Sequence, residues 1–426
     1  MTMGDSRPGD AMPGAQKASP RGAVVLGGAH GSLEIARSLG RRGIRVWLVT
    51  DDNPLAKSSR YVEKSFAWAG PRDHGALAFL TELCRAHDLR GWVLFAGSDD
   101  DLCFVAQNHS ALGSLFTLTT PPWDAVRFAY DKRQMNIRAA ELGIAHPRTR
   151  YPRTADDIAD HLAEAELAFP VILKPSIREG RNAFVDAKAW RVDHPLELAA
   201  RYAAAKALVG AETIMIQELI PGTGAAQYSY AAVWDRGVPV GALVARRRRQ
   251  YPVEFGFTST FVETADAPEV ADAAARFLAS IDYSGLVEIE FKYDARDGRF
   301  KILDVNARAW TWIALGAAAG IDFPALQWAL ACGEQIAPLA ARPGVSWLYF
   351  ARDLAASIHE MAAGRLSALD YLRSLNQSSA RAVFAFDDPW PAVIDIPLSA
   401  VRVVTRRLSR RSRNATAALQ SARLPS

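Results

Sequence analysis

The chain has 426 residues, half of them apolar, and it carries 50 lysines and arginines against 46 aspartates and glutamates. This length exceeds the roughly 100–200 residues of one ordinary domain, so we expect two or three domains, and the apolar share excludes a wholly disordered chain. The longest apolar run, Trp312 to Ile321, is about half of the roughly 20 residues that a membrane span requires.

The charge is unevenly distributed along the chain. Seven arginines and no acidic residue lie after residue 401, which leaves 43 basic against 46 acidic residues in the rest of the chain. The basic excess therefore belongs to the C-terminus, and no nucleic-acid-binding face is expected. The first twenty residues lack the apolar region of a secretory signal, and the three cysteines are sparse and widely spaced. These features predict a cytoplasmic protein.

The pattern of residues 21–122 predicts a Rossmann-like domain with a parallel sheet, preceded by a disordered segment of residues 1–20. A buried strand at 22–28 runs into a glycine turn, helical spacing follows at 33–39, and a second strand covers 44–49. Strand, helix and strand within about thirty residues form a βαβ unit. Helices and strands then alternate over residues 76–87, 92–96, 102–107 and 115–118.

Residues 123–335 predict a second domain of two lobes, with a lid lobe at about 147–212. A single helix over 124–142 opens this domain. Strands are expected at 169–174, 213–218, 228–234, 238–246, 285–293 and 300–305, and helices at 195–209 and 267–280. We expect residues 336–397 to form an extension packed on this domain and residues 398–426 to be a flexible basic tail. The fold class is therefore α/β.

The most informative stretch is GLVEIEFKYDARDGRFKILDVNAR, residues 285–308. If two strands turn around Asp297-Gly298, the period-two alternation brings Glu290 near Asp304 and Asn306. Carboxylate and amide oxygens are hard ligands that suit Mg²⁺ bound to phosphates. Arg308 follows on the same alternation and points to the same site, where it would stabilise phosphoryl charge. The alternative is a hairpin whose acidic residues merely face water.

This stretch resembles the metal-binding hairpin of the ATP-grasp superfamily. The resemblance extends from Asp131 to Gly333 and is strongest to the carboxylate–amine ligase branch, which includes D-aspartate ligase and the large chain of carbamoyl-phosphate synthase. Lys132 and Lys174 match the two lysines that bind ATP phosphates, and residues 217–222 match the hinge whose backbone reads adenine. The resemblance thus implies an ATP-grasp domain of two lobes after the Rossmann-like domain.

The resemblance also implies roles for individual residues. It places metal binding on Glu290, Asp304 and Asn306, nucleotide binding on Lys132, Lys174, Gln217, Glu218, Leu219 and Gln227, and catalysis on Arg308, Lys174 and Arg249. The sequence departs from the family pattern at three places. Asp304 stands where glutamate is usual, Ala307 where proline is usual, and the phosphate-covering loop at 176–182 contains one glycine. Fewer backbone N–H groups then approach phosphate closely.

Two further clusters point to substrate binding. A run of four arginines, Arg246–Arg249, follows a strand, and alternation places two of them on one face and two on the other. One of these pairs would receive a carboxylate or its acyl phosphate. The alternative is that the run is simply a solvated face. The resemblance, which includes Gly256, favours function for Arg249. Ser98-Asp99-Asp100 follow an apolar strand at the edge where parallel sheets bind ligands. They bind a substrate amino group or, as the simpler interpretation, cap a helix.

The expected function is ATP-dependent ligation of a small carboxylate and a small amine through an acyl phosphate, with ATP and Mg²⁺ (or Mn²⁺) as cofactors. A homodimer remains open. One alternative is a non-catalytic, regulatory ATP-binding module. Another is an NAD-dependent dehydrogenase, suggested by the glycine turn at 27–31 and by Asp51 at the end of the next strand. GGAHGS does not fit G-x-G-x-x-G in any register, which weighs against this second alternative.

Overall fold

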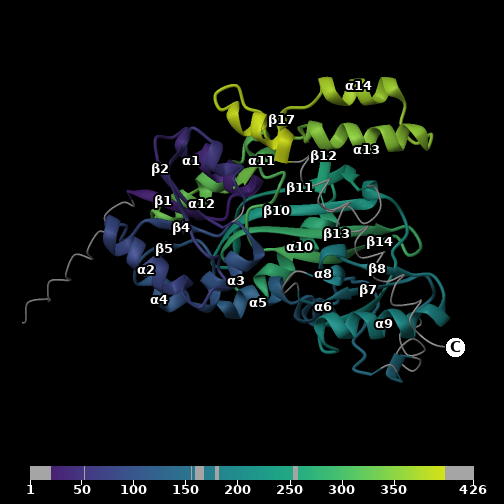
Figure 1. Cartoon of the computed structure of the whole chain (residues 1–426). Helices are drawn as coiled ribbons and strands as arrows, with labels where there is room; N and C mark the ends of the chain where they lie inside the picture. The colour runs from purple at the N-terminus through teal and green to yellow at the C-terminus, as the bar shows by residue number, and fades with distance from the viewer. Residues whose placement is uncertain are drawn as a thin grey trace, which may run out of the picture.

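The structure, a computed structural model, describes residues 21–51, 53–154, 156–158, 167–177, 182–252 and 258–398. Within these residues the strands form three sheets. Figure 1 shows the sheet that contains β1 at the left, strands β7 and β8 at the lower right, and β10 and β11 between them. None of the helices in the described ranges is long and apolar enough to cross a membrane.

The first sheet is parallel, as the βαβ pattern predicts. Its strands, in the order β3-β2-β1-β4-β5, are β1 (Gly22–Leu26), β2 (Arg45–Thr50), β3 (Val62–Ala67), β4 (Val93–Phe95) and β5 (Thr117–Leu118). Alternate residues of β1 pack on opposite faces, because side chains of a strand alternate. Ala23 and Val25 join the core that contains α1 (His30–Gly40), whereas Val24 joins the core that contains α2 (Ala76–His87). Helices α3 (Asp99–Gln107) and α4 (His109–Gly113) follow β4.

Strand β3 has no counterpart among the predicted elements. It lies at the edge of the sheet, and its sequence VEKSFA is partly exposed with charged residues in the first half. Such a strand lacks the apolar run that marks the buried strands β1, β2 and β4. Charged residues are common on edge strands, where they discourage pairing with another chain.

The single helix predicted at 124–142 is two helices, α5 (Trp123–Tyr130) and α6 (Lys132–Glu141). Asp131 stands between them in an extended conformation, and its carboxylate accepts a hydrogen bond from the Arg133 N–H as the N-cap of α6. The break frees the Lys132 N–H to donate to the Ser176 carbonyl at 2.9 Å. It therefore fixes Lys132 at the first position of α6.

The second sheet is small and antiparallel. In the order β6-β9-β7-β8, its strands are β6 (Thr149–Arg150), β7 (Val171–Pro175), β8 (Trp190–Val192) and β9 (Ile214–Glu218). Helices α8 (Ala183–Ala187) and α9 (Pro195–Val209) supply Phe184, Leu198 and Tyr202 to its core. The predicted helix at 195–209 is confirmed by α9.

The third sheet is the largest and is mostly antiparallel. Its strands run in the order β14-β13-β10-β11-β12-β16-β17, with β15 paired to β11, and they are β10 (Gln227–Asp235), β11 (Val238–Tyr251), β12 (Thr258–Thr264), β13 (Gly285–Asp294), β14 (Arg299–Asn306), β15 (Leu339–Ala340), β16 (Ser346–Leu348) and β17 (Ala380–Arg381). The apolar residues Val287, Ile289 and Phe291 of β13 pack against α10 (Pro268–Ala279). The intervening residues of β13 therefore face the opposite side of the sheet.

The first and third sheets share one continuous core. Residues of β1 and α1 belong to the same buried cluster as residues of β10, β11, α11 (Ala314–Ala318) and α12 (Phe323–Ala331). The approach is close enough to require glycine at position 31, because an added Cβ there would lie 2.8 Å from the Ala309 carbonyl oxygen. The segment that follows β14 is thereby held directly against α1.

The C-terminal part of the described chain packs over β11, β12 and the first sheet. Helices α13 (Phe350–Ala362) and α14 (Ala368–Asn376) lie at the top of Figure 1. After them, Asp388 reaches Arg37 on α1, with 2.9 Å between the Arg37 Nε and the Asp388 Oδ2, and both side chains are fully buried. The same carboxylate accepts a hydrogen bond from the Ser59 hydroxyl at 2.7 Å.

Replacing Asp388 with alanine should lower the free energy of unfolding by at least about 3 kcal/mol, because it leaves the Arg37 guanidinium buried beside Glu34 without its main partner. The neighbouring change Asp387→Ala is the matched control. Asp387 pairs with Arg41 at 2.7 Å, but both side chains are 42% exposed, so this pair should contribute less than about 1 kcal/mol. Urea unfolding of both variants measures the difference, and equal losses would contradict it.

Candidate functional site

Strands β13 and β14 place polar side chains on the face opposite α10. Their pairing sets Glu290 against Asp304 and Glu288 against Asn306, so the predicted register around Asp297-Gly298 is confirmed. An irregularity in the pairing next to Glu290 leaves Leu303 as an extra residue on β14. Leu303 and Asp304 consequently both line the same cavity.

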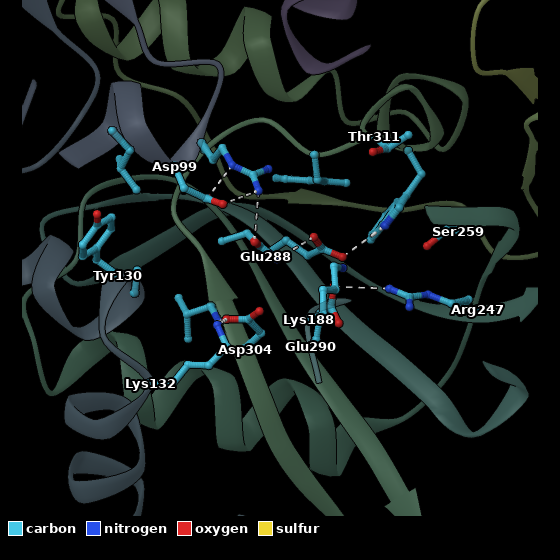
Figure 2. A pocket seen from close by; sticks show the side chains of 17 residues that line it. Asp99, Tyr130, Lys132, Lys188, Arg247, Ser259, Glu288, Glu290, Asp304 and Thr311 are labelled. Carbon is cyan, nitrogen blue, oxygen red and sulfur yellow. Dashed lines mark hydrogen bonds and ion pairs between the residues drawn. The ribbon is translucent and has the colours of Figure 1, made fainter. Parts of the chain in front are cut away.

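The acidic residues of this hairpin are paired with cations from other elements (Figure 2). The Lys132 Nζ lies 2.6 Å from the Asp304 Oδ1, and the Arg247 Nη2 lies 3.2 Å from the Glu290 Oε1. The Asn306 side chain donates to Glu288 at 3.2 Å. The start of α6, the strand β11 and the hairpin thus converge on one point, although they are far apart in the sequence.

Glu288 is the most deeply buried carboxylate of this group. Its Oε1 accepts hydrogen bonds from the Ser229 hydroxyl at 2.9 Å and from the Trp312 indole at 3.1 Å. Burial and the neighbouring Glu290 raise the pKa of the Glu288 carboxyl to about 7. The shift comes first from burial and then from the negative charge of Glu290, and the guanidinium of Arg247 partly opposes it.

The donor set fits Mg²⁺ bound together with phosphate. Glu290, Asp304 and Asn306 offer carboxylate and amide oxygens on one face, which are the ligands that hard cations prefer. Within the described ranges no group of three or more histidine, cysteine, aspartate or glutamate side chains is arranged to hold a metal by itself. Mg²⁺ usually relies on one or two protein carboxylates and takes its other ligands from substrate phosphates and water, and Glu290 and Asp304 would supply the two carboxylates.

Two cavities meet at the paired charges. The smaller has a volume of about 130 Å³ and is lined by the polar face of the hairpin with Asp99, Arg308, Ser259 and Trp312. The larger has a volume of about 700 Å³ and lies between the hairpin and the second sheet. Both cavities are lined by the same five charged residues, namely Lys132, Lys188, Arg247, Glu290 and Asp304. We call these five residues the junction.

The larger cavity contains the residues predicted for nucleotide binding. Lys132, Lys174, Gln217, Glu218, Leu219 and Gln227 all line it. Lys174 ends the apolar strand β7, and burial together with the nearby Lys132 ammonium lowers the pKa of Lys174 to about 8. The adjoining wall is apolar, with Ile172 from β7 and Leu303 from β14. A cavity of this volume, with an apolar wall on one side and many charged side chains on the other, suits a ligand that has both an apolar and an anionic part.

The side chain of Glu218 is held by other parts of the protein. Its carboxylate oxygens lie 2.8 Å from the Lys301 Nζ and 2.9 Å from the Arg296 Nη2, and both cations also contact Asp294. The Gln217 amide donates to the Thr149 hydroxyl at 2.8 Å. The contacts of Glu218 tie the end of β9 to the hairpin, and the contact of Gln217 ties it to β6.

Arg308 is positioned by the start of α3. Its Nε and Nη2 lie 2.7 and 3.2 Å from the two oxygens of Asp99, which is the first residue of α3. The Arg308 Nη2 also donates to the Asn306 Oδ1 at 3.4 Å. Ser98 caps α3, as the simpler interpretation of this motif predicted, since its hydroxyl accepts from the Asp101 N–H at 3.1 Å. Asp99, in contrast, faces the small cavity.

Arg249 does not line either cavity. It forms a buried ion pair with Asp353 of α13 at 2.7 Å and also donates to the Ser374 hydroxyl. The arginine run lies inside β11, where the pairing with β12 is irregular around Arg248. This irregularity separates Arg247, which faces the hairpin, from Arg249, which faces the C-terminal helices. The arginine that reaches the site is therefore Arg247.

The structure places four further residues at the junction or the small cavity. The sequence predicts Arg247 only as one member of an arginine run, leaves Asp99 as an amino-group ligand or a cap, and presents Glu288 only as one acid of the hairpin stretch. Lys188 had no signal in the sequence; it ends α8 with a left-handed φ of 63°, an uncommon conformation for a residue with a side chain. Residues 178–181 of the phosphate-covering loop and Gly256 lie outside the described residues.

Other parts of the chain pack closely against the glycine turn at 27–31. A Cβ added at Gly28 would lie 1.8 Å from the Asn53 carbonyl oxygen, and the Gly28 carbonyl accepts from the Ala56 N–H at 2.8 Å. Gly31 meets Ala309 in the same way. These glycines therefore serve close packing of the chain, which weighs further against a dinucleotide bound at this turn.

Comparisons with known proteins agree with this geometry. Residues 211–351 match a protein family described as "ATP-grasp in the biosynthetic pathway with Ter operon". No curated protein matches the sequence at a significant level. Solved structures are similar in fold at low identity.

The biotin carboxylase of Campylobacter jejuni, in complex with β,γ-ATP, has a TM-score of 0.60 and 15% identity over 76% of this chain and 74% of its own. The L-amino acid ligase of Bacillus licheniformis has a TM-score of 0.57 and 16% identity over 78% and 79%. The biotin carboxylase domain of the Hydrogenobacter thermophilus 2-oxoglutarate carboxylase, with MgADP and bicarbonate, has a TM-score of 0.59 and 14% identity over 76% and 73%.

Proposed function

We propose that this chain, an ATP-grasp protein by its fold and by the family match of residues 211–351, is an ATP-dependent carboxylate–amine ligase. The observation that carries the proposal is the junction. A cavity large enough for a nucleotide and a small polar cavity meet at three cations and two carboxylates. A phosphoryl group that passes from one cavity to the other must cross these charges.

The larger cavity is the proposed site of ATP. The adenine would lie against Ile172 and Leu303, next to the backbone that follows Glu218, with Gln227 on the ribose side. Lys132 and Lys174 would bind the phosphates as point charges from two different lobes. Mg²⁺, held by Glu290, Asp304 and Asn306 together with phosphate oxygens, would neutralise part of the charge of the transferred phosphoryl group.

The smaller cavity is the proposed site of the carboxylate. Arg247 and Arg308 line it and would orient the carboxylate for attack on the γ-phosphorus of ATP. The attack forms the C–O–P bond of an acyl phosphate and breaks the bond between the γ-phosphorus and the β,γ-bridging oxygen, which releases ADP. An amine then attacks the acyl carbon, inorganic phosphate leaves, and the amine loses a proton as the amide forms. The net reaction joins acid and amine with conversion of ATP to ADP and phosphate.

The volume of the small cavity limits the size of the carboxylic acid substrate. About 130 Å³ is slightly less than the cavity of about 150 Å³ that accommodates benzene in an engineered protein. We therefore propose a carboxylate with a short polar chain, with a larger amine approaching from outside. We also propose that residues 123–335 form the ATP-binding unit in the cytoplasm, with the lid at about 147–212.

The test is release of ADP and phosphate from MgATP across a panel of small carboxylates and amines. Release that requires one specific acid together with an amine supports ligation. ATP binding without release for any pair would favour the regulatory ATP-binding module. Enhanced fluorescence of bound reduced NAD, without ATP binding, would favour the dehydrogenase.

Replacing Asp99 with asparagine should lower kcat by about tenfold or more and leave the KM for ATP nearly unchanged. Asp99 contacts Arg308 on the side of the small cavity, so its loss lets the guanidinium move away from the carboxylate but not from the nucleotide. Asp100→Asn is the matched control, since Asp100 pairs with Arg72 on the surface. Steady-state kinetics of ADP release measures kcat and KM for both variants. An equal loss of kcat in Asp99→Asn and Asp100→Asn would contradict the proposed role of Asp99.

A further inference from the structure

Lys188 reaches the junction from a different sheet than the other four junction residues. Those four lie on α6 or on strands of the third sheet, whereas Lys188 connects α8 to β8 of the second sheet. In Figure 2 Lys188 is drawn next to Glu290, in the small cavity that both residues line, and both also line the larger cavity. The second sheet thus contributes one of the five charges at the junction.

The backbone at position 188 has a conformation that suits glycine. Its φ is 63° and its ψ is −41°, which lies outside the left-handed helical region, where ψ is positive. The connection is short, because α8 ends at Ala187 and β8 begins at Trp190, which pairs with Leu173 of β7. Both ends of the connection are anchored, since Phe184 of α8 is fully buried with its ring centroid 4.8 Å from that of Trp190. Two residues remain between these anchors, and position 188 takes a positive φ, as helix ends usually do with glycine.

Lysine is therefore an unfavourable residue for this backbone. A residue with a Cβ is strained at this combination of φ and ψ, and glycine would relieve the strain. Three other described residues with a side chain have a positive φ, and none of them lines either cavity: Asp88, Arg236 and Asp282. Strained backbone conformations gather at ligand sites, where the side chain has a function that outweighs the cost.

The charge at the junction indicates what that function is. Lys132 and Arg247 each pair with a carboxylate of the hairpin, and Lys188 adds a third cation, so the cations outnumber the two carboxylates. Burial lowers the pKa of Lys174, and the ammonium groups of Lys132 and Lys188 lower it further. Lys188 therefore lies close enough to the proposed phosphate-binding lysines to act on the same anion.

We propose that Lys188 contacts the γ-phosphoryl group of ATP while that group passes to the carboxylate, and that its strained backbone is retained for this contact. The inference rests on the proposed function. Because Lys188 lines both cavities, one ammonium can neutralise charge on the phosphoryl group in ATP and in the acyl phosphate. A contact with the γ-phosphate alone also makes Lys188 distinguish ATP from ADP.

Three substitutions at position 188 separate charge from strain. Lys188→Met removes the charge and keeps the strain, Lys188→Gly removes both, and Lys188→Arg keeps both. The Met and Gly variants should lower kcat for ADP release by about 10²-fold and weaken binding of a non-hydrolysable ATP analogue by about tenfold, whereas the affinity for MgADP stays within about twofold of the parent value. Lys188→Arg should lose less than about tenfold in kcat.

The melting temperature measures the strain in the same variants. Lys188→Gly should melt about 1–2 °C above Lys188→Met in circular dichroism, because only glycine adopts this backbone conformation without cost. The matched control is Arg236→Gly, which relieves a positive φ of 45° in the exposed turn between β10 and β11. Arg236→Gly should leave ADP release and both nucleotide affinities at the parent values.

The outcomes distinguish this inference from the proposed function. If the parent chain releases no ADP with any pair of acid and amine, the proposed function fails and this inference fails with it. If the parent is active and Lys188→Met turns over at the parent rate, the proposed function stands and the role of Lys188 is wrong. Equal weakening of the ATP analogue and MgADP would contradict the contact with the γ-phosphate. Equal melting temperatures of Lys188→Gly and Lys188→Met would contradict the strain.

Discussion

Replacing Glu290 with glutamine should reduce ADP release by at least about 10³-fold, because the change removes a carboxylate from the junction, the proposed point of phosphoryl transfer. Glu290 lines both cavities and pairs with Asp304 across the hairpin, so its charge is part of the proposed Mg²⁺ site. Asn306→Ala should have a similar effect, since Asn306 offers the amide oxygen on the same face. The measurement is the single-turnover rate of ADP formation at saturating MgATP.

A matched control for Glu290 lies on the same sheet. Glu263 of the inner strand β12 pairs with Arg248 at 3.4 Å; both side chains are partly exposed and neither lines a cavity, so Glu263→Gln should retain nearly full activity. Both variants should unfold at temperatures close to that of the parent chain, because neither carboxylate is fully buried. If Glu290→Gln and Asn306→Ala both turn over at the parent rate, the phosphoryl-transfer site lies elsewhere.

Replacing Lys174 with methionine should weaken MgATP binding by about 10²-fold, because the proposed contact of a partly buried ammonium with the phosphates is lost, which costs about 2–5 kcal/mol. The pH dependence has a definite sign. The pKa of Lys174 is about 8, so the side chain is an ammonium below that pH and a neutral amine above it. The affinity of the free protein for ATP should therefore fall as pH rises through about 8. Calorimetric titration with a non-hydrolysable ATP analogue over this range measures the effect.

Arginine at position 174 provides the control for charge. The guanidinium of Lys174→Arg stays protonated at every pH of the experiment, so this variant should lose the inflection near pH 8 even if its affinity at pH 7 is lower. Lys188 and Lys132 line the same junction and remain unchanged. An inflection of the same size in the parent chain and in Lys174→Arg would show that another group controls the pH dependence.

The sequence predicts the hairpin well because its structure depends on local rules. Alternation places Glu290, Asp304 and Asn306 on one face, and the turn at 295–298 determines the register. The cationic side chains that contact these residues come from other elements, and local rules do not predict their positions. The prediction of Lys132 rests on a family motif, and the break at Asp131 that fixes its position depends on a contact with Ser176.

The arginine run shows where sequence reasoning fails. Simple alternation divides Arg246–Arg249 into two pairs, but an irregular pairing around Arg248 directs Arg247 to the hairpin and Arg249 to Asp353. Nothing in the four identical residues marks which one meets Glu290. The partner of Arg249 is about one hundred residues away, on a helix whose position depends on the completed sheet.

Asp99 illustrates a second limit. Its position at the start of α3 is predictable from the strand and the cap that precede it, whereas its partner Arg308 belongs to another part of the fold. The contact exists because α1 packs closely on Ala309, which in turn requires glycine at position 31. The site is therefore assembled by packing between the first and third sheets, and the local sequence carries only its separate parts.

The most direct test of the account is the fate of carboxylate oxygen during turnover. With the acid and amine found in the panel, the acid is labelled with ¹⁸O in its carboxylate and the products are analysed by mass spectrometry. An acyl phosphate formed at the junction requires that one labelled oxygen per turnover appear in inorganic phosphate, with ADP unlabelled. Phosphate free of label, or label found in AMP, would show that the carboxylate never receives the γ-phosphoryl group of ATP.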